Sequence, residues 1–483
     1  MTSSAVAVGP GTAPAPPPAP ARPFGQADRA LRRRACRVLL GSWTGHSTVP
    51  SHGLYPHQWS WDSAFIAIGL RHLSPLRAQR ELETLLGAQW GDGRVPHIVF
   101  NRAVPLGAYF PSPDFWRSST AGAAAGAPAA LETSGIVQPP VHALAAWLVH
   151  RADPASSARR GFLARVYPRL VAWHRYLADR RDLGGGGLAA VVHPWEPGMD
   201  NSPCWDGPLA RIEPAAADSF RRADLVHGAA ADRPTDLDYG RYVRLAAEYR
   251  DHGYRDAAAP HPFAVEDPGF NALLVASEYA LARIARTLGG VPDVHRERAA
   301  ALTDALVERL WSPEAGQFLS RDLRADGAGR TAGQLVTARS AAGLLPLLTP
   351  DLPPAVVEAL LGTVRGPHFG LGTTVRLLPS YDLRGAAFDP HRYWRGPAWF
   401  NVNWLLERGL RLHGAGQRAD ALAEEILRAA ADSRFAEYLD PHTGAGRGAR
   451  DFGWTAALAL DLLARRARQA PAPVPVPAPR KDS

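Results

Sequence analysis

Apolar residues recur at three- and four-residue spacing over most of the chain between residues 24 and 467. This spacing places apolar side chains along one face of a helix. Gly and Pro stand mostly between the periodic segments, where helices stop. The pattern predicts an all-α fold of about twelve helices. The clearest helical segments are 80–90, 139–152, 161–182, 271–289, 296–311, 355–365, 397–416, 418–435 and 454–468.

Strand-like alternation is rare, and residues 187–195 give its best example. The chain carries no strong repeat of the solenoid families. Helices of similar length joined by loops of unequal size can form a bundle, a superhelix or a closed toroid. A toroid would gather the long loops at one end around a pit, whereas a solenoid would spread them out.

The two ends of the chain, residues 1–23 and 468–483, are rich in Ala and Pro. Their composition predicts disordered tails on either side of a single domain, residues 24–467. The start lacks the charged and leucine-rich regions of a signal peptide. No apolar run reaches the roughly 18–20 residues that cross a bilayer. We therefore expect a cytoplasmic protein without membrane contact.

Composition argues against several functional classes. Cys36 and Cys204 lie far apart and are expected to be free thiols. The net charge of +8 comes almost entirely from arginine, and its densest cluster, 31–37, is expected on the outer face of a helix instead of a nucleic-acid surface. Neither zinc-type Cys/His spacing nor a phosphate-binding loop is present. We expect no cofactor and no metal; homo-oligomerisation is left open.

Four loop segments combine Trp or Tyr with a carboxylate, an arginine or an asparagine: 55–65, 195–206, 393–404 and 435–446. Sugars need this mixture, because their CH faces pack on aromatic rings and their hydroxyls bind Asp, Asn and Arg. The tryptophans of any single loop could instead belong to the core. Their association with charged residues in four loops favours a polyol-binding site.

Five strings carry a family resemblance and follow one another in order along the chain: QWSWDSAF, TSGIVQPPVHA, WEPGMDNSP, YWRGPAWFNVNWLL and EYLDPHTG with FGWTAALALD. The chain resembles glycoside hydrolase family 63, and within it the bacterial mannosylglycerate and glucosylglycerate hydrolases. The resemblance spans nearly everything between the tails. It implies an (α/α)6 toroid of the six-hairpin glycosidase type, with long loops at one end, which hydrolyses α-glycosides with inversion.

Inverting hydrolysis needs two carboxyl groups on opposite sides of the anomeric carbon. The resemblance implies Asp200 as the general acid and Glu437 as the general base. The indoles that flank Asp200 would partly desolvate it and raise its pKa, as an acid at neutral pH requires. Asp200 could instead be a turn or cap residue, and Glu437 a helix-end charge. Glu196 and Asp206 are rival acids, although sugar binding or loop bracing suits them better, and Asp440 is a rival base.

The resemblance implies that Asp62 binds the sugar hydroxyls, with Trp59 and Trp61 as the platform of the sugar. Asp62 could equally cap the helix that follows it. Arg395 would clamp hydroxyls or brace a catalytic carboxylate, and a structural salt bridge is the alternative. The other sugar contacts that we expect are Trp195, Glu196, Asn201, Trp394 and Trp399.

A glycerate leaving group carries a carboxylate, which calls for an arginine beyond the scissile bond. The resemblance implies that Arg233 and Tyr239 hold this carboxylate, and that Tyr55 and Gln138 hold the glycerate hydroxyls. The alternative for Arg233 is a surface arginine in a loop. Sequence leaves the choice between glucose and mannose open, since it depends on the orientation of one hydroxyl.

The function expected from these residues is inverting hydrolysis of a small anionic glycoside, such as glucosylglycerate or mannosylglycerate. Its only expected partner is that small-molecule glycoside. One alternative is an α-glucosidase or trehalase-like hydrolase of neutral oligosaccharides, which needs no arginine at the leaving-group side. A second is a sugar-binding toroid without activity. A third is a sugar epimerase, which would use histidines from the set His57, His97, His142 and His193.

Overall fold

The computed structural model describes residues 25–225, 230–325 and 333–469. The predicted tail over residues 1–23 therefore lies outside the described residues, and so does most of the tail predicted from residue 468. The last helix continues past the predicted domain end at residue 467 and finishes at Gln469. Cys36 and Cys204 are both free thiols, as expected. No described helix is both long and apolar enough to cross a bilayer.

The chain is mostly helical, and each of the nine predicted helical segments falls on a helix. The α-helices are α1 (Gln26–Gly41), α2 (Ser60–Leu70), α3 (Pro75–Gly87), α4 (Pro113–Trp116), α5 (Ser118–Ala121), α6 (His142–Ala152), α7 (Pro154–Arg159), α8 (Phe162–Arg181), α9 (Asp206–Ala210), α10 (Asp236–Asp251), α11 (Pro268–Thr287), α12 (Asp293–Leu310), α13 (Pro354–Arg365), α14 (Phe400–Leu412), α15 (Gly416–Asp432) and α16 (Gly453–Gln469). A longer 3-10 segment, η6, spans Ala341–Leu348.

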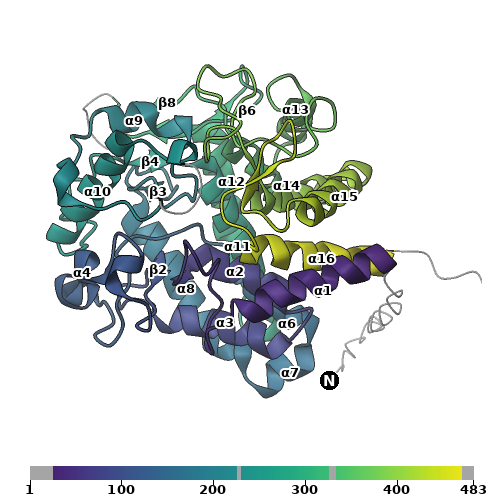
Figure 1. Ribbon diagram of the computed structural model, residues 1–483, viewed down its shortest axis with the longest axis horizontal. Helices are drawn as coiled ribbons and strands as arrows, with labels where there is room; N and C mark the ends of the chain where they lie inside the picture. The colour runs from purple at the N-terminus through teal and green to yellow at the C-terminus, as the bar shows by residue number, and fades with distance from the viewer. Residues whose placement is uncertain (1–24, 226–229, 326–332, 470–483) are drawn as a thin grey trace, which may run out of the picture.

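Six of these segments contact one another in a closed circuit. α2 packs on α6, α6 on α11, α11 on η6, η6 on α14, α14 on α16, and α16 returns to α2. A second set of helices lies against this circuit: α3 on α2, α8 on α6 and α11, α12 on α11, α13 on η6, α15 on α14, and α1 on α16. Figure 1 shows α1 and α16 side by side, so the first and last helices meet.

Burial distinguishes the two sets of helices. Every residue of α2 is buried, as is expected of a helix surrounded by protein. By contrast, α1 buries only Leu31, Ala35, Val38 and Leu39, which form one stripe. The predicted basic cluster 31–37 lies on α1, and its arginines are half-buried or exposed. The sequence pattern thus separates central helices from covering ones.

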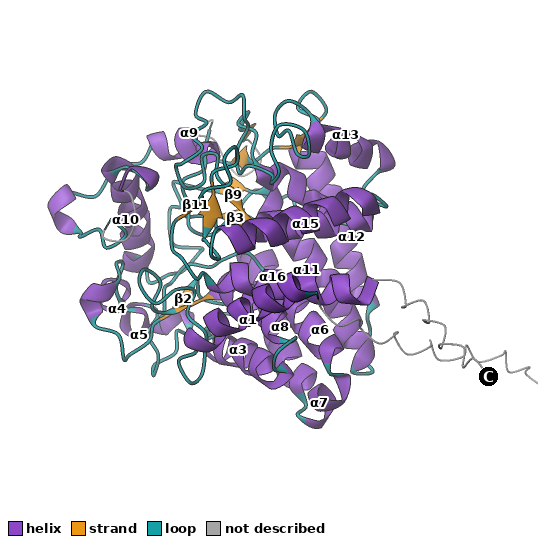
Figure 2. Ribbon diagram, turned by 45° about the vertical axis from the view of Figure 1, so that its right-hand side comes forward, coloured by secondary structure: helices purple, strands orange, loops and turns teal. Residues whose placement is uncertain are grey.

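The strands are short and pair antiparallel. They are β1 (Gln58–Trp59), β2 (Ile98–Val99), β3 (Ala190–Val191), β4 (Val265–Glu266), β5 (Trp311–Ser312), β6 (Gln317–Phe318), β7 (Arg321–Asp322), β8 (Gln334–Leu335), β9 (Ala398–Trp399), β10 (Tyr438–Leu439) and β11 (Gly446–Arg447). They form the sheets β1-β2, β5-β6, β3-β4-β7-β8 and β11-β10-β9. The strand predicted within 187–195 is confirmed as β3. Figure 2 shows β2, β3, β9 and β11 among the long loops beside the main group of helices.

The sequence pattern missed α10. A capping box starts this helix, in which the Thr235 side chain accepts from the Asp238 backbone and the Asp238 side chain accepts from the Thr235 backbone. Its buried face includes three tyrosines, Tyr239, Tyr242 and Tyr249, in place of aliphatic residues. Tyrosine gives a weaker apolar signal because its hydroxyl is polar.

Candidate active site

A single cavity brings together residues from all four aromatic loop segments that the sequence singled out. This gathering at one place agrees with the pit expected of a closed arrangement of helices. The lining residues are Tyr55, Trp59, Trp61, Asp62, His97, Tyr109, Gln138, Trp195, Gly198, Asp200, Tyr393, Trp394, Trp399, Glu437, Phe452 and Trp454.

Asp200 reaches the cavity from the loop between β3 and η3, a short 3-10 turn over Pro203–Trp205. Gly198 in this loop has φ +73°, and a Cβ there would come within 2.5 Å of the Trp61 ring. Glycine is therefore required for the loop to approach the indole. The Tyr242 hydroxyl donates to the backbone carbonyl of Asp200 at 2.6 Å and fixes the loop from α10.

The environment of Asp200 favours its protonated form. Burial raises the pKa of its carboxyl from 3.8 to about 7, and the negative charge of Glu437 adds to this increase. The backbone N–H of Asp200 and the Arg233 guanidinium act in the opposite direction. A carboxyl with this pKa can carry a proton at neutral pH and give it to a substrate oxygen.

Glu437 lies immediately before β10, and its surroundings differ from those of Asp200. Its Oε1 accepts a 2.8 Å hydrogen bond from the Tyr55 hydroxyl, and its Oε2 accepts a 2.9 Å bond from the Ala449 backbone N–H. The Arg233 Nη2 lies 3.9 Å from Oε2. Donors and a cation around both oxygens stabilise a carboxylate, the form that a general base requires.

Tryptophans form much of the cavity wall and at the same time belong to the packed interior. Trp394 stacks on Trp399 with 3.8 Å between ring centroids and 2° between planes. Trp61 meets the Trp454 ring edge-on at 5.4 Å. Trp195 stacks on His97 at 6.2 Å. These indoles therefore belong both to the packed core and to the site, because they pack against neighbouring rings and also line the cavity.

Asp62 lines the cavity from within α2. The helix begins at Ser60, so Asp62 is its third residue and the alternative role as N-cap is wrong. The position before the helix belongs to Trp59, whose side chain makes no cap. Instead, the Gln138 Oε1 accepts a 3.1 Å hydrogen bond from the Trp61 backbone N–H. Burial, followed by the charge of Glu437, raises the pKa of Asp62 well above its usual value.

Arg233 is held against the cavity wall instead of standing at the surface. Its side chain is buried, donates to the Tyr55 hydroxyl at 3.2 Å and lies over the Tyr393 ring at 4.7 Å. Its Nη2 is buried and has no hydrogen-bond partner among the described residues. A buried guanidinium nitrogen without an acceptor is costly unless a ligand supplies one.

The structure places two predicted binding residues, Glu196 and Arg395, in ion pairs. Glu196 is fully buried, receives both Arg181 Nη atoms at 2.7 and 2.8 Å and accepts from the Val192 backbone N–H at 2.7 Å. Arg395 makes a bidentate salt bridge to Asp206 at 2.8 and 2.6 Å. Neither Glu196 nor Arg395 lines the cavity.

Tyr239 and Asn201 are also absent from the cavity lining. The Tyr239 hydroxyl donates to the Phe110 carbonyl at 2.9 Å, so this side chain braces the wall behind Trp195. Asn201 is buried, and its backbone oxygen accepts from Arg395. The structure therefore does not bring Tyr239 and Asn201 into the cavity lining with the other predicted binding residues.

The rival catalytic carboxylates lie outside the cavity lining as well. Asp206 is paired with Arg395, as described above. Asp440 accepts hydrogen bonds from the backbone N–H groups of His442 and Thr443, which lower its pKa. Its place is a turn after β10. Asp200 and Glu437, unlike these rival carboxylates, line the cavity.

Sequence reasoning did not select several lining residues as binding residues: His97, Tyr109, Tyr393, Phe452 and Trp454. Tyr393, Phe452 and Trp454 stand inside the family-like strings, so the strings themselves were a usable signal. Tyr109 comes from an irregular loop with no comparable signal. Its hydroxyl has a pKa raised above the usual range by burial and by the charge of Asp200.

The histidines considered for an epimerase are poorly suited to proton transfer at neutral pH. Burial lowers the pKa values of His57 and His142 to about 4 and those of His97 and His193 to about 3. Such histidines stay neutral at pH 7 and have no proton to donate as imidazolium. Within the described part of the chain, no group of three or more His, Cys, Asp or Glu side chains could hold a metal ion.

Comparisons with known proteins identify the family of the chain. The family model described as "Mannosylglycerate hydrolase MGH1-like glycoside hydrolase domain" matches residues 55–455. The chain is 42% identical to the mannosylglycerate hydrolase of Rubrobacter radiotolerans over 91% of this chain and 98% of that protein. It is 39% identical to the glucosylglycerate hydrolase of Mycolicibacterium hassiacum over 90% and 97%.

A solved structure extends the match to three dimensions. The GH63 mannosylglycerate hydrolase from Thermus thermophilus, in complex with Tris and D-glycerate, superposes with a TM-score of 0.79 at 38% identity. The match covers 89% of this chain and 99% of that one. Family model, sequence relatives and structure agree over nearly the whole described chain. The chain is therefore a glycoside hydrolase and belongs to the mannosylglycerate hydrolase MGH1-like family within GH63.

Proposed function

We propose that this enzyme hydrolyses an α-glycoside of glycerate with inversion, using Asp200 as general acid and Glu437 as general base. The observation that carries the proposal is the contrast between the two carboxyls at one cavity. Burial raises the pKa of Asp200 to about 7, whereas Glu437 is surrounded by hydrogen-bond donors. Two carboxyls with opposite environments are suited to opposite proton-transfer roles.

In this mechanism Asp200 protonates the glycosidic oxygen as the bond to the anomeric carbon breaks. Glu437 takes a proton from a water that attacks the opposite face of the sugar ring. The two carboxyl groups must stand roughly 6.5–9.5 Å apart to admit that water. One turnover leaves Asp200 ionised and Glu437 protonated, and exchange with solvent restores both.

The helices are proposed to form an (α/α)6 toroid. The closed circuit of α2, α6, α11, η6, α14 and α16 supports this architecture, because each member is covered by a helix or helices of the second set. One of the six inner segments, η6, is a 3-10 segment containing Pro346, which cannot continue an α-helix hydrogen-bond pattern. A toroid explains how carboxyls more than two hundred residues apart reach one pit.

The proposed sugar contacts are Asp62 and the lining tryptophans Trp59, Trp61, Trp195, Trp394 and Trp399. Their indoles offer apolar faces to the CH groups of the ring. Asp62 would bind hydroxyls, for which a protonated carboxyl offers both a donor and an acceptor. These residues would bind any hexose of suitable shape, so they do not separate glucose from mannose.

The leaving-group side is proposed to accept glycerate through Arg233, Tyr55 and Gln138. The buried Nη2 of Arg233 without a hydrogen-bond partner supports this assignment, because a carboxylate would satisfy it. The relatives reported above are named for glycerate glycosides, and one was solved with D-glycerate. A hydrolase of neutral oligosaccharides would leave this buried guanidinium without an anionic ligand.

Early product analysis by NMR tests the reaction. We expect the β-anomer of the sugar to appear first from an α-glycoside, before mutarotation. An α-anomer as first product would defeat the inverting mechanism. Glucosylglycerate and mannosylglycerate, compared in parallel with neutral disaccharides, would identify the sugar.

The Arg233→Ala variant tests the leaving group. It should lose at least about tenfold more kcat/KM on the glycerate glycosides than on a neutral aryl α-glycoside, since it removes a charge-assisted contact. The neutral substrate is the internal control for damage to the fold or to the catalytic carboxyls. Equal loss on both substrates would reject glycerate as the leaving group.

A further inference from the structure

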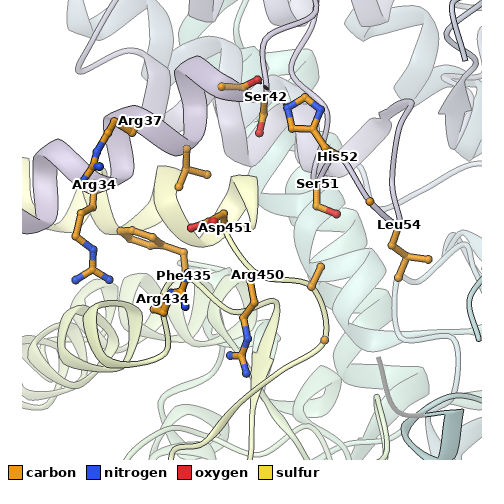
Figure 3. Close-up of a pocket in the computed structure, with 15 residues that line it drawn as sticks. Arg34, Arg37, Ser42, Ser51, His52, Leu54, Arg434, Phe435, Arg450 and Asp451 are labelled. Atoms are coloured by element: carbon orange, nitrogen blue, oxygen red, sulfur yellow. Dashed lines mark hydrogen bonds between the residues drawn. The ribbon is translucent and has the colours of Figure 1, made fainter. Parts of the chain in front are cut away.

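A second cavity lies directly behind the wall of the active site and is the subject of Figure 3. Its volume is about 850 Å³, within the range of small-molecule sites. Its residues come from α1 and the turn after it and from the segments 51–54, 434–435 and 448–451. The two cavities share no lining residue, but their walls are contiguous in sequence at Leu54–Tyr55 and Asp451–Phe452.

The lining of this second cavity is strongly basic. It carries Arg34, Arg37, Arg434 and Arg450 against one carboxylate, Asp451. Figure 3 shows Arg34 and Arg37 on α1 and Arg434, Phe435 and Arg450 on the facing segments. Like charges gathered around a hollow create a positive potential that attracts anions.

The four arginines lack anionic partners. None of them forms a salt bridge with any residue that the structure describes. Arg34 donates to the Ala431 carbonyl at 2.9 Å, and Arg450 to the Gly446 carbonyl at 2.6 Å. Arg37 and Arg434 make neither a side-chain hydrogen bond nor a salt bridge within the described ranges. The guanidinium groups of Arg37 and Arg434 are therefore available for a ligand, whereas Arg450 already donates to carbonyls from both terminal nitrogens.

A buried hydroxyl gives an independent indication of a ligand. Ser51 lines the cavity and is only 6% exposed. Its Oγ has no hydrogen-bond partner in the described part of the chain. A buried polar atom left without a partner costs about 1–3 kcal/mol. A ligand oxygen at this position would satisfy it.

We propose that this cavity is a binding site for a phosphate group, either as inorganic phosphate or as the phosphate ester of a small polar metabolite. Arginine guanidinium groups match the tetrahedral oxygens of phosphate by paired hydrogen bonds. Ser51 supplies a hydroxyl donor to the same group. The cavity volume leaves room for the body of an ester beyond its phosphate.

The site is placed to influence catalysis. Gly448 and Ala449 line the phosphate cavity, and the Ala449 backbone N–H donates to the Oε2 of Glu437. Phe435, also in the lining, stands two residues before Glu437. A phosphate bound here acts on the segment that positions the general base, so it should change kcat. This consequence for kcat rests on the proposed function, whereas phosphate binding does not.

Isothermal titration calorimetry with inorganic phosphate, at ionic strength held constant with sodium chloride, tests the binding. The double variant Arg37→Gln/Arg434→Gln should bind phosphate at least about tenfold more weakly than the native enzyme. The matched control is Arg80→Gln/Arg376→Gln, because both arginines are exposed, lie outside both cavities and have the same charge. Equal affinity in the two double variants, or heat no greater than that of chloride, overturns the proposal.

Ser51→Ala provides a second, milder variant. It removes a hydroxyl that has no intramolecular partner, so the melting temperature should not fall, yet phosphate affinity should drop severalfold. Unchanged affinity together with a lower melting temperature would show a purely structural hydroxyl and would contradict the site. Glucose 6-phosphate titrated in parallel separates the two sources: tighter binding than inorganic phosphate indicates an ester, and weaker binding indicates the free ion.

The kinetic arm separates this inference from the proposed function. Phosphate should alter kcat of the native enzyme and of the Arg80→Gln/Arg376→Gln control, but not kcat of Arg37→Gln/Arg434→Gln. Should Asp200→Ala and Glu437→Ala both keep full activity, the proposed function fails while calorimetric phosphate binding still stands. Calorimetric binding without any kinetic response would reject the coupling to Glu437.

Discussion

The loop that carries Asp200 and the segment that carries Glu437 give their carboxyl groups opposite surroundings, because only the second supplies hydrogen-bond donors to both carboxyl oxygens. The first, residues 193–206, is fixed by its backbone and by the buried pair Arg181–Glu196, and no described side chain donates to the Asp200 carboxyl. The second, residues 435–452, places hydrogen-bond donors on both oxygens of Glu437. Hydrogen bonds to the charged form of a carboxyl favour that form, and the Asp200 carboxyl receives none from a described side chain.

This contrast explains the composition of the stretch HPWEPGMDNSPCWD. Its tryptophans desolvate the site, its glycine admits Trp61, and two of its three carboxylates are neutralised by arginines. Only Asp200 is left without a cation bound directly to its carboxyl. The charges of Glu196 and Asp206 are thus balanced by arginines, which distinguishes these two carboxylates from the Asp200 carboxyl.

The largest effect expected to separate the two carboxyls comes from their removal. Asp200→Ala and Glu437→Ala should each lower kcat on a glycerate glycoside by about 10³-fold. With α-glucosyl fluoride, whose leaving group needs no proton, Asp200→Ala should recover much of its activity and Glu437→Ala should not. Initial rates on both substrates measure this difference.

Circular dichroism and thermal melting of both variants control for folding. If both variants recovered activity on the fluoride, the assigned roles would be rejected. If Glu437→Ala alone recovered activity, the two roles would be reversed. Full activity of either variant on the glycoside would exclude that residue from the mechanism.

The next largest effect concerns stability and compares the two ion pairs of the Asp200 loop. Arg181→Met leaves the fully buried Glu196 without its cation and should lower the free energy of unfolding by about 3–5 kcal/mol. Arg395→Gln breaks a pair whose Asp206 side chain is 52% exposed, so its cost should be about 0–1 kcal/mol. Urea denaturation of the two variants measures the difference, and equal costs would refute this distinction.

A pH profile sharpens the comparison further. Because the pKa of Asp200 is raised to about 7, the acid keeps its proton below that pH and loses it above. In the free enzyme kcat/KM should therefore fall about tenfold per unit above pH 7. Arg233 lowers the pKa of Asp200, so Arg233→Gln should move this alkaline limb to higher pH. A limb that stays in place would exclude Asp200 as its origin.

The smallest effect is a change in melting temperature. A folded pKa of about 7 against an ordinary 3.8 means that stability from Asp200 is complete below pH 3.8 and is lost as pH rises through 7. Asp200→Asn carries no charge and should therefore melt about 2 °C higher than the native enzyme at pH 8, with the difference shrinking toward pH 4. Glu437→Gln should show no such gain, since it discards hydrogen bonds to a carboxylate.

Sequence alone located the helices and most of the cavity because both have local signals. Periodic aliphatic residues indicated the helices, and the mixture of indoles with carboxylates indicated the four loops. The tyrosine-rich α10 had no such aliphatic period and was missed. For Arg395 the sequence left open a substrate contact, a brace for a catalytic carboxylate or a structural salt bridge, because its partner could not be seen: Asp206 lies 189 positions from Arg395, and nothing in a linear pattern pairs them.

Tyr239 illustrates a second limit. The family resemblance implied that Tyr239 shares a ligand with Arg233, but α10 turns the Tyr239 hydroxyl toward the Phe110 carbonyl. Arg233 precedes that helix; it is not a lining residue itself, but it contacts Tyr55, Tyr393 and Glu437, which line the cavity. Arg233 lies before the start of α10 and Tyr239 lies within it, so the two side chains have different roles. The cap at Thr235 fixes where α10 starts, and only the folded chain displays this cap.

The meeting of α1 with α16 has a consequence for biosynthesis. The ribosome delivers α2 and its neighbours long before α16, which covers α2 in the finished protein. Until then a flank of α2 has no native covering, and Glu437, which lies 16 residues before the start of α16, has only just been made. The enzyme therefore cannot complete its fold or its active site before α16 has been synthesised. A nascent chain truncated before α16 should require chaperone protection and should have no hydrolase activity.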